Sequence, residues 1–187
     1  TSLTDAFVMK LDTALNFKWV KPYGGLNDDM PFQLRRYDSL LVIAGSYYNN
    51  IDLNPSATST AIHTSNGDED CFVQVLDTNG NYVWSRAFGG TGLDWSGKFA
   101  VDTNGTILLG GYFQNTVDFD PNPSTDYMLT SKGGYDAFIL DLDILGSFKN
   151  AAAFGSSIPG FLDIITSRAV ENSNQSIAVG YFRNTMD

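Results

Sequence analysis

The stretch DAFVMKLDTALNFKWVKPYGG, from Asp5 to Gly25, occurs in three versions along this chain. The second version is DCFVQVLDTNGNYVWSRAFGG, from Asp70 to Gly90, and the third is DAFILDLDILGSFKNAAAFGS, from residue 136 to residue 156. Their starts lie 65 and then 66 residues apart, and they align over 21 positions without a gap. A repeat of this period predicts an architecture of similar units placed side by side.

Each copy reads as two β-strands joined by a short turn. In the first strand Phe and Leu occupy one face and Val or Ile the other, which predicts a strand covered on both sides. In the second copy, Asn79-Gly80 supplies the positive φ that a tight turn requires. Five columns are invariant: Asp5/Asp70/Asp136, Phe7/Phe72/Phe138, Leu11/Leu76/Leu142, Asp12/Asp77/Asp143 and Gly24/Gly89/Gly155.

A second block alternates with the first. KFAVDTNGTILLGGYFQNTVD ends at Asp118 and SRAVENSNQSIAVGYFRNTMD ends at Asp187, 69 residues later, while a looser copy, FQLRRYDSLLVIAGSYYNNID, ends at Asp52. The turns at 103–105 and 37–39 again join two short apolar strands, so this block is also a hairpin. Four strands per repeat and no segment with helical periodicity predict an all-β fold of four-stranded antiparallel blades.

The composition excludes several classes of function. The chain has 187 residues and a formal net charge of -10, which argues against binding to nucleic acid phosphates or to anionic lipid. No run of 18 apolar residues is present, so membrane insertion is not expected. The single cysteine, Cys71, stands in the column of Ala6 and Ala137 and is expected to be a small buried residue.

The two blocks resemble the blade of the bacterial SBBP-type β-propeller repeat. DCFVQVLDTNGNYVW and KFAVDTNGTILLGGYF carry this resemblance, and the continuation TVDFDPNP is similar to a form found in surface and secreted proteins of the Bacteroidetes group. The resemblance covers almost the whole chain. It implies a blade with the second block as its inner hairpin and the first as its outer hairpin.

On this pattern the chain forms one propeller segment of about three blade-equivalents. It divides into a half-blade at 1–25, blades at 26–90 and 91–156, and a half-blade at 157–187. Closed propellers contain about four to eight blades, so three equivalents do not close a ring. We therefore expect the ring to be completed either by the remainder of a longer propeller chain or by another copy. A Thr-Ser pair precedes each copy of the first block, at Thr1-Ser2, Thr64-Ser65 and Thr130-Ser131. The chain starts within this recurring signal and stops at Asp187, which favours the longer chain.

Loop acids are the first candidates for a binding site. Propeller geometry implies that two polar insertions, 53–69 and 119–135, emerge on one face together with Asp28, Asp94 and Asp163. Binding residues are common on loops held by a rigid scaffold. The alternative is that these aspartates cap turns by accepting hydrogen bonds from nearby backbone amides.

The loop DFDPNPSTD is the candidate for calcium. Oxygen donors at alternate positions, Asp118, Asp120, Asn122, Ser124 and Asp126, resemble the spacing of calcium loops. Two prolines restrict how the loop can wrap, and a proline-stiffened turn with Phe119 tucked against the blade is the alternative. No cofactor is expected to be required.

No catalytic constellation stands out. His63 is the only histidine, which leaves little material for a His-based metal site or triad. We therefore expect a non-enzymatic extracellular or cell-surface segment for adhesion, protein or glycan binding, or scaffolding. The alternatives are a polysaccharide hydrolase or lyase with Asp28, Asp94 and Asp163 at the channel mouth, and a passive spacer in a larger surface assembly.

Overall fold

The protein is all-β, with antiparallel sheets throughout its described residues. The structure is a computed structural model that describes residues 4–155, 157, 162–166 and 178–182. No helix occurs in these ranges. The strands are β1 (Ala6–Leu11), β2 (Phe17–Gly25), β3 (Asp29–Tyr37), β4 (Leu40–Asp52), β5 (Ile62–Asp77), β6 (Tyr82–Phe88), β7 (Trp95–Val101), β8 (Ile107–Phe113), β9 (Thr116–Asp118), β10 (Met128–Thr130), β11 (Asp136–Leu142), β12 (Phe148–Phe154), β13 (Leu162–Thr166) and β14 (Ala178–Phe182).

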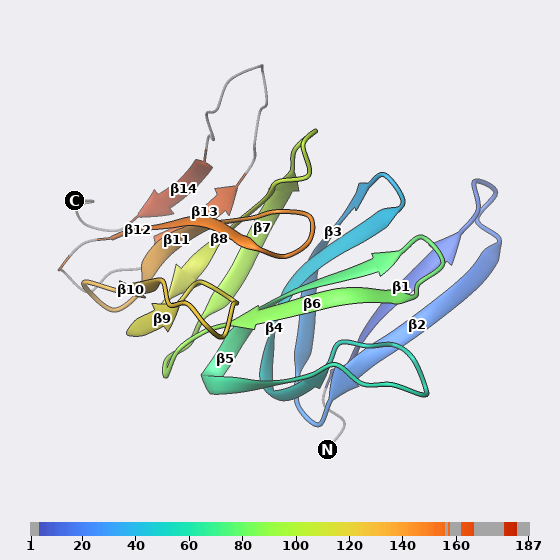
Figure 1. Cartoon of the computed structure of the whole chain (residues 1–187), viewed down its shortest axis with the longest axis horizontal. Coiled ribbons are helices and arrows are strands. Elements are labelled where there is room, and N and C mark those ends of the chain that lie inside the picture. Colours follow the sequence, from blue (N-terminus) through green and yellow to red (C-terminus); the bar gives the residue numbers. More distant parts are fainter. Residues whose placement is uncertain (1–3, 156, 158–161, 167–177, 183–187) are drawn as a thin grey trace.

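Two four-stranded meanders form the centre of the molecule (Figure 1). One runs β3-β4-β5-β6 and the other β7-β8-β11-β12, so each joins an inner and an outer hairpin as the sequence predicts. The β1–β2 hairpin joins the first meander through pairs of Gly24 with Asp52 and Gly25 with Ile51. The β13–β14 hairpin pairs with no other described strand. The described strands form neither a closed barrel nor a closed ring.

The insertions are partly regular, which differs from the loops expected at 53–69 and 119–135. β5 already begins at Ile62 and continues the ladder with β4 as far as Asp52. In the second insertion β10 pairs with β9. Pairing between the two ends of each insertion gives the backbone N–H and C=O groups there hydrogen-bond partners within the chain.

Four hairpin turns share one aspartate-centred design. Asp77 Oδ1 accepts hydrogen bonds from the backbone N–H groups of Asn79 at 2.7 Å and Asn81 at 2.9 Å. Gly80 has φ of 80°, as the Asn-Gly pair predicts. Asp12, Asp102 and Asp143 accept equivalent pairs of hydrogen bonds. An aspartate therefore closes each of these turns, because it satisfies two N–H groups that the strands leave free. In the outer hairpins it is the invariant residue of the column Asp12/Asp77/Asp143.

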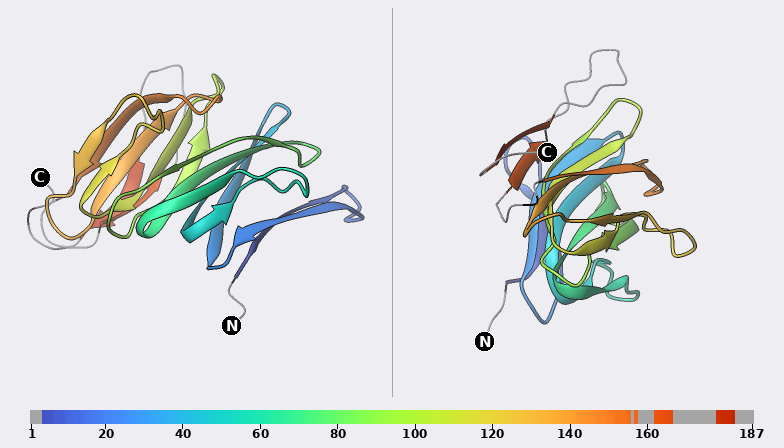
Figure 2. Two further views of the ribbon diagram at one scale, coloured as in Figure 1. Left: turned by 60° about the horizontal axis from the view of Figure 1, so that its bottom comes forward. Right: turned by 90° about the vertical axis from the view of Figure 1, so that its left-hand side faces the viewer.

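Apolar layers lie between neighbouring sheets, and the sheets themselves follow one another across the left view of Figure 2. Phe72 and Val73 are adjacent on β5 and both are fully buried, Phe72 in the layer with β1 and β2 and Val73 in the layer with the second meander. The prediction that this strand is covered on both sides is confirmed. Cys71 is also buried, as expected.

An aspartate and a glycine are in contact in every outer hairpin. A Cβ built on Gly89 would lie 2.2 Å from the carboxyl carbon of Asp70, and one built on Gly155 would lie 2.0 Å from that of Asp136. In the first hairpin the corresponding distance, from Gly24 to an Asp5 oxygen, is 2.7 Å. The invariance of both columns follows, because a larger residue at the glycine would displace the carboxylate beneath it.

This contact predicts the effect of Gly89→Ala. The added methyl group must move a buried carboxylate, and we expect unfolding free energy to fall by about 1–3 kcal/mol in urea denaturation. Gly134→Ala is the control, because no atom lies within 4 Å of a Cβ built there. Equal stability of the two variants would contradict the steric explanation.

Candidate functional site

Asp94 is a structural clamp in this fold. Its side chain is buried, Oδ2 accepts a hydrogen bond from Gly90 N at 2.6 Å, and Oδ1 accepts one from Gln114 N at 3.0 Å. The carboxylate thus ties the segment after β6 to the end of β8. This arrangement agrees with the alternative that the loop aspartates cap turns, because both carboxylate oxygens of Asp94 accept hydrogen bonds from backbone N–H groups.

Asp29, rather than Asp28, occupies the equivalent position in the preceding unit. Asp29 is buried and accepts a hydrogen bond from Gly25 N at 2.6 Å, as Asp94 does from Gly90. Asp28 is partly exposed and accepts one from Thr4 N at 2.7 Å. The sequence prediction grouped Asp94 with Asp28. The units are 65 residues apart at this point, so the counterpart of Asp94 is Asp29, one residue further along the chain. The backbone of Asp163 pairs with Tyr181, and its side chain lies outside the described part.

The structure adds a second buried acid, Asp70, beside Asp94. Asp70 is buried against Gly89, and its Oδ2 accepts a hydrogen bond from Asn66 N at 3.0 Å. Burial and, to a smaller extent, the negative charge of Asp94 raise the pKa of Asp70 to about 7. Burial also raises the pKa of Asp94 and of Asp29 to about 6. Sequence reasoning found Asp70 invariant but could not detect its burial beside another acid.

The raised pKa values predict that stability increases as pH is lowered from about 8 to about 5.5. In this window the folded chain holds protons on these aspartates that the unfolded chain has released, so protonation favours folding. His63 opposes this trend, since burial lowers its pKa. Differential scanning calorimetry should show a higher Tm at the lower pH.

Asp70→Asn should weaken that pH dependence. The asparagine amide oxygen can still accept the hydrogen bond from Asn66 N, but the group no longer titrates. Asp126→Asn, at an exposed position, controls for the reduced net charge. A Tm that falls from pH 8 to 5.5 in the unmodified protein would contradict the prediction.

Three of the five predicted calcium donors, Asp118, Asp120 and Asn122, accept hydrogen bonds from backbone amides of the loop itself. Asp118 Oδ1 accepts hydrogen bonds from Asp120 N and Tyr127 N, at 3.0 and 2.8 Å. Asp120 and Asn122 each accept one from the amide two residues further on. Phe119 is buried, as in the proline-stiffened alternative. Among the described residues no group of three or more His, Cys, Asp or Glu side chains is arranged to hold a metal ion.

Chelation therefore should have little effect on this loop. We expect EDTA treatment to leave Tm unchanged, because backbone N–H groups already occupy the Oδ1 atoms of Asp118, Asp120 and Asn122. The measurement is thermal unfolding with EDTA and then with added calcium. A calcium-dependent rise in Tm that disappears in Asp120→Asn would instead establish calcium binding.

Each insertion lines a polar surface groove. The loop after β4 is held by Asp52, whose Oδ1 accepts hydrogen bonds from Asn54 N and Ala61 N, and it runs alongside β6 toward β2 (Figure 1). The groove between this loop, the turn after β5 and β2 has a volume of about 530 Å³. Its lining residues are Lys21, Asn54, Pro55, Ser56, Ala57, Ser59, Gly80, Asn81 and Tyr82.

The second insertion forms an equivalent groove of about 400 Å³. Its lining residues are Arg86, Asp120, Pro121, Asn122, Pro123, Gly146, Ser147 and Phe148. Arg86 stands in the repeat column of Lys21, and Phe148 in that of Tyr82. Each groove therefore combines a cation from the preceding outer hairpin, an insertion, and the turn and aromatic residue of its own outer hairpin. These parts are far apart in the sequence and meet only in the folded chain, so no local sequence motif predicts the groove.

A hydrogen-bond network orders the first groove. His63 Nε2 and Ser85 Oγ are 2.8 Å apart, and the hydroxyl of Tyr82 lies 2.9 Å from the same Ser85 oxygen. Ser85 is only 3% exposed, so this serine–histidine pair is not accessible for attack on a substrate. The network instead holds the Tyr82 ring at the groove. No motif around His63 predicts this contact, because Ser85 lies 22 residues away in the sequence.

No protein-family model matches the chain, and a search of curated proteins finds no significant relative. Among the described residues no helix has the length and apolarity needed to cross a membrane. The fold and the site thus define a class: an all-β repeat protein of antiparallel sheets with two equivalent polar grooves on its surface.

Proposed function

We propose that this chain is a β-propeller-type repeat segment of an extracellular or cell-surface protein, with a non-enzymatic binding or scaffolding role. The two meanders support this proposal, since each has the four-strand order of a propeller blade. The apolar layers between consecutive sheets are in keeping with blades packed face to face. The extracellular location is supported by the acidic, Asn- and Ser-rich composition and by the sequence resemblance described above.

We further propose that the two insertion grooves bind glycans. The observation that carries this proposal is the recurrence of one arrangement: a Lys or Arg, a polar insertion and an aromatic ring. Hydroxyl-rich ligands need hydrogen-bond donors and acceptors together with an apolar surface, and both grooves offer all of these. Arg86 directs one Nη to the backbone carbonyl of Ser85, at 3.0 Å, and its other donors are available for a ligand.

Removal of Arg86 tests the groove. With the full chain and a glycan selected on an array, we expect Arg86→Ala to weaken affinity about tenfold, because hydrogen bonds to a charged group contribute about 1.5–3 kcal/mol. Isothermal titration calorimetry is the measurement. Arg35→Ala is a matched control, since Arg35 also donates to the carbonyl of the preceding residue but lines neither groove.

Equal losses in the two variants, or no glycan bound by the unmodified chain, would contradict glycan binding at this groove.

A hydrolase or lyase reaction through Asp94 is not favoured, because its carboxylate is buried and accepts two backbone hydrogen bonds. A passive spacer role predicts the same sheets but no ligand, so the array separates it from the proposed function.

A further inference from the structure

The two insertion grooves have the same design but differ in charge. The first insertion contains no charged residue between 53 and 61, whereas the second contains Asp120 and Asp126 between 119 and 127. Asp120 occupies the repeat column of Asn54, and each of the two lines its own groove. The lining of the first groove therefore has one cation, Lys21, and no acid, whereas the second groove combines Arg86 with Asp120.

The exchange between Asn54 and Asp120 leaves the loop structure unchanged. The Oδ1 atom of each accepts a hydrogen bond from the amide two residues further on, at 3.0 and 2.9 Å. Asn54 Nδ2 donates to the Ser59 hydroxyl at 3.0 Å, and the Thr125 hydroxyl, in the column of Ser59, donates to Asp120 Oδ2 at 2.6 Å. A hydroxyl can donate or accept, so either residue fits this column. The column thus sets the charge of the groove without altering its shape.

Lys21 is available to a ligand in the first groove. Within the described part of the chain it has no carboxylate at ion-pair distance, while Lys18 and Asp12 form an ion pair. A Cβ built on Gly80 would lie 2.9 Å from Lys21 Cγ and 3.2 Å from its Cε, so the lysine stem lies along the turn. Packing of the stem limits its rotamers and holds the ammonium group at the groove.

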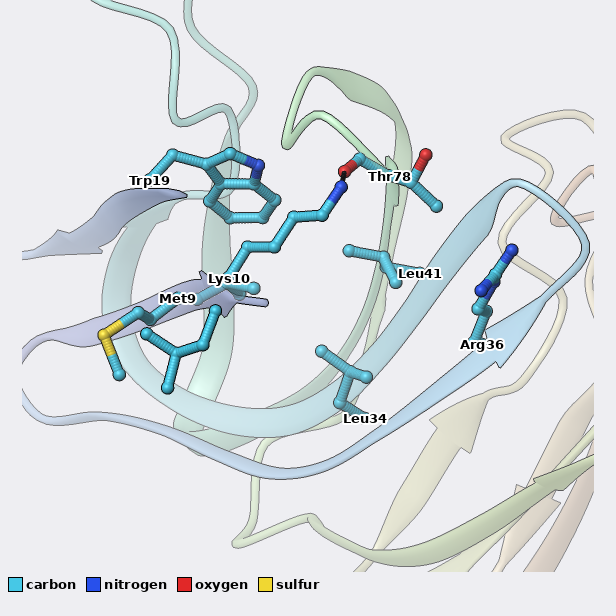
Figure 3. A pocket seen from close by; sticks show the side chains of 9 residues that line it. Met9, Lys10, Trp19, Leu34, Arg36, Leu41 and Thr78 are labelled. Carbon is cyan, nitrogen blue, oxygen red and sulfur yellow. Dashed lines mark hydrogen bonds between the residues drawn. The ribbon is translucent and has the colours of Figure 1, made fainter. Parts of the chain in front are cut away.

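The turn that lines each groove is tied to the preceding outer hairpin. Lys10 donates a hydrogen bond to the carbonyl oxygen of Thr78 at 2.7 Å, and Figure 3 shows this lysine extending from β1 to the turn. Ile144 stands in the column of Thr78, and its carbonyl accepts a hydrogen bond from Trp84 Nε1 at 3.0 Å. Both grooves are therefore held in place before a ligand arrives, which lowers the cost of ordering on binding.

The other acids near the grooves do not account for the difference between them. The loop base carries an aspartate in both, Asp52 or Asp118, and so does the turn, Asp77 or Asp143. All four carboxylates accept hydrogen bonds from backbone amides. Acids further away are screened, because the Debye length is about 8 Å at an ionic strength of about 0.15 M. The second insertion alone adds acids of its own.

We propose that the first groove selects sugars that carry a carboxylate, with Lys21 as the charge partner and Asn54 as the position that permits this selection. The inference rests on the proposed glycan binding and names the ligand class of one groove. A sugar carboxylate beside Lys21 accepts charge-assisted hydrogen bonds. In the second groove Asp120 repels the same carboxylate and offsets the attraction of Arg86, so acidic and neutral sugars bind there about equally.

A pair of probes that differ only in charge tests this selection. The full chain is titrated calorimetrically at about 0.15 M salt with oligogalacturonate and with its methyl ester. We expect the acidic form to bind about three- to fivefold more tightly, which is the range of an exposed ion pair. Asn54→Asp should abolish this preference and leave the affinity for the ester unchanged. Asn104→Asp is the control, because it adds the same charge at an exposed turn that lines neither groove.

The reverse exchange gives a result that does not depend on the stability of the first variant. Asp120→Asn should increase the affinity for the acidic form and leave that for the ester unchanged. Equal affinity of the unmodified chain for the two forms, or a preference that survives in Asn54→Asp, would overturn the inference while glycan binding stands. Binding of neither form, when another glycan on the array is bound, would do the same. Binding of no glycan at all would refute the proposed function together with this inference.

Discussion

The contact between a carboxylate and a glycine at the strand end constrains each outer hairpin. Asp70 lies directly beneath Gly89, and Asp136 lies beneath Gly155. The carboxylates also accept hydrogen bonds from Asn66 N and Lys132 N, so each one ties the segment before the hairpin to its first strand. Since a Cβ at the glycine would occupy the space of the carboxylate, the glycine cannot be enlarged without displacing the acid. This explains why both columns stay constant while their neighbours vary.

That local closure sets the positions of the sheets. With each outer hairpin closed, Phe72 and Phe138 face the preceding sheet and Val73 faces the following one. Burial of apolar surface on both faces then holds consecutive sheets together, at roughly 25 cal/mol per Å² of apolar area.

The grooves follow from the repeat as well. Asp52 and Asp118 close the two insertions with the same pair of backbone hydrogen bonds, and buried Leu53 and Phe119 anchor them against the sheet. Each insertion is thus held beside the next turn and the preceding cation. Variation in the loop can change the groove without disturbing the sheets. Such separation between scaffold and loop is common where binding sites evolve.

The sequence by itself determined the all-β class, the strand order within each meander and the aspartate-centred turns, because these depend on contacts between residues close along the chain. Gly80 and Asp77 needed no tertiary information to be placed in a turn. Only the tertiary structure decided that Asp29 is the counterpart of Asp94, that His63 meets Ser85, and that Arg86 meets the second insertion. Each of these three relations depends on how separate hairpins pack against one another. Packing between sheets sets those positions, and a linear pattern of residue types does not encode such distances.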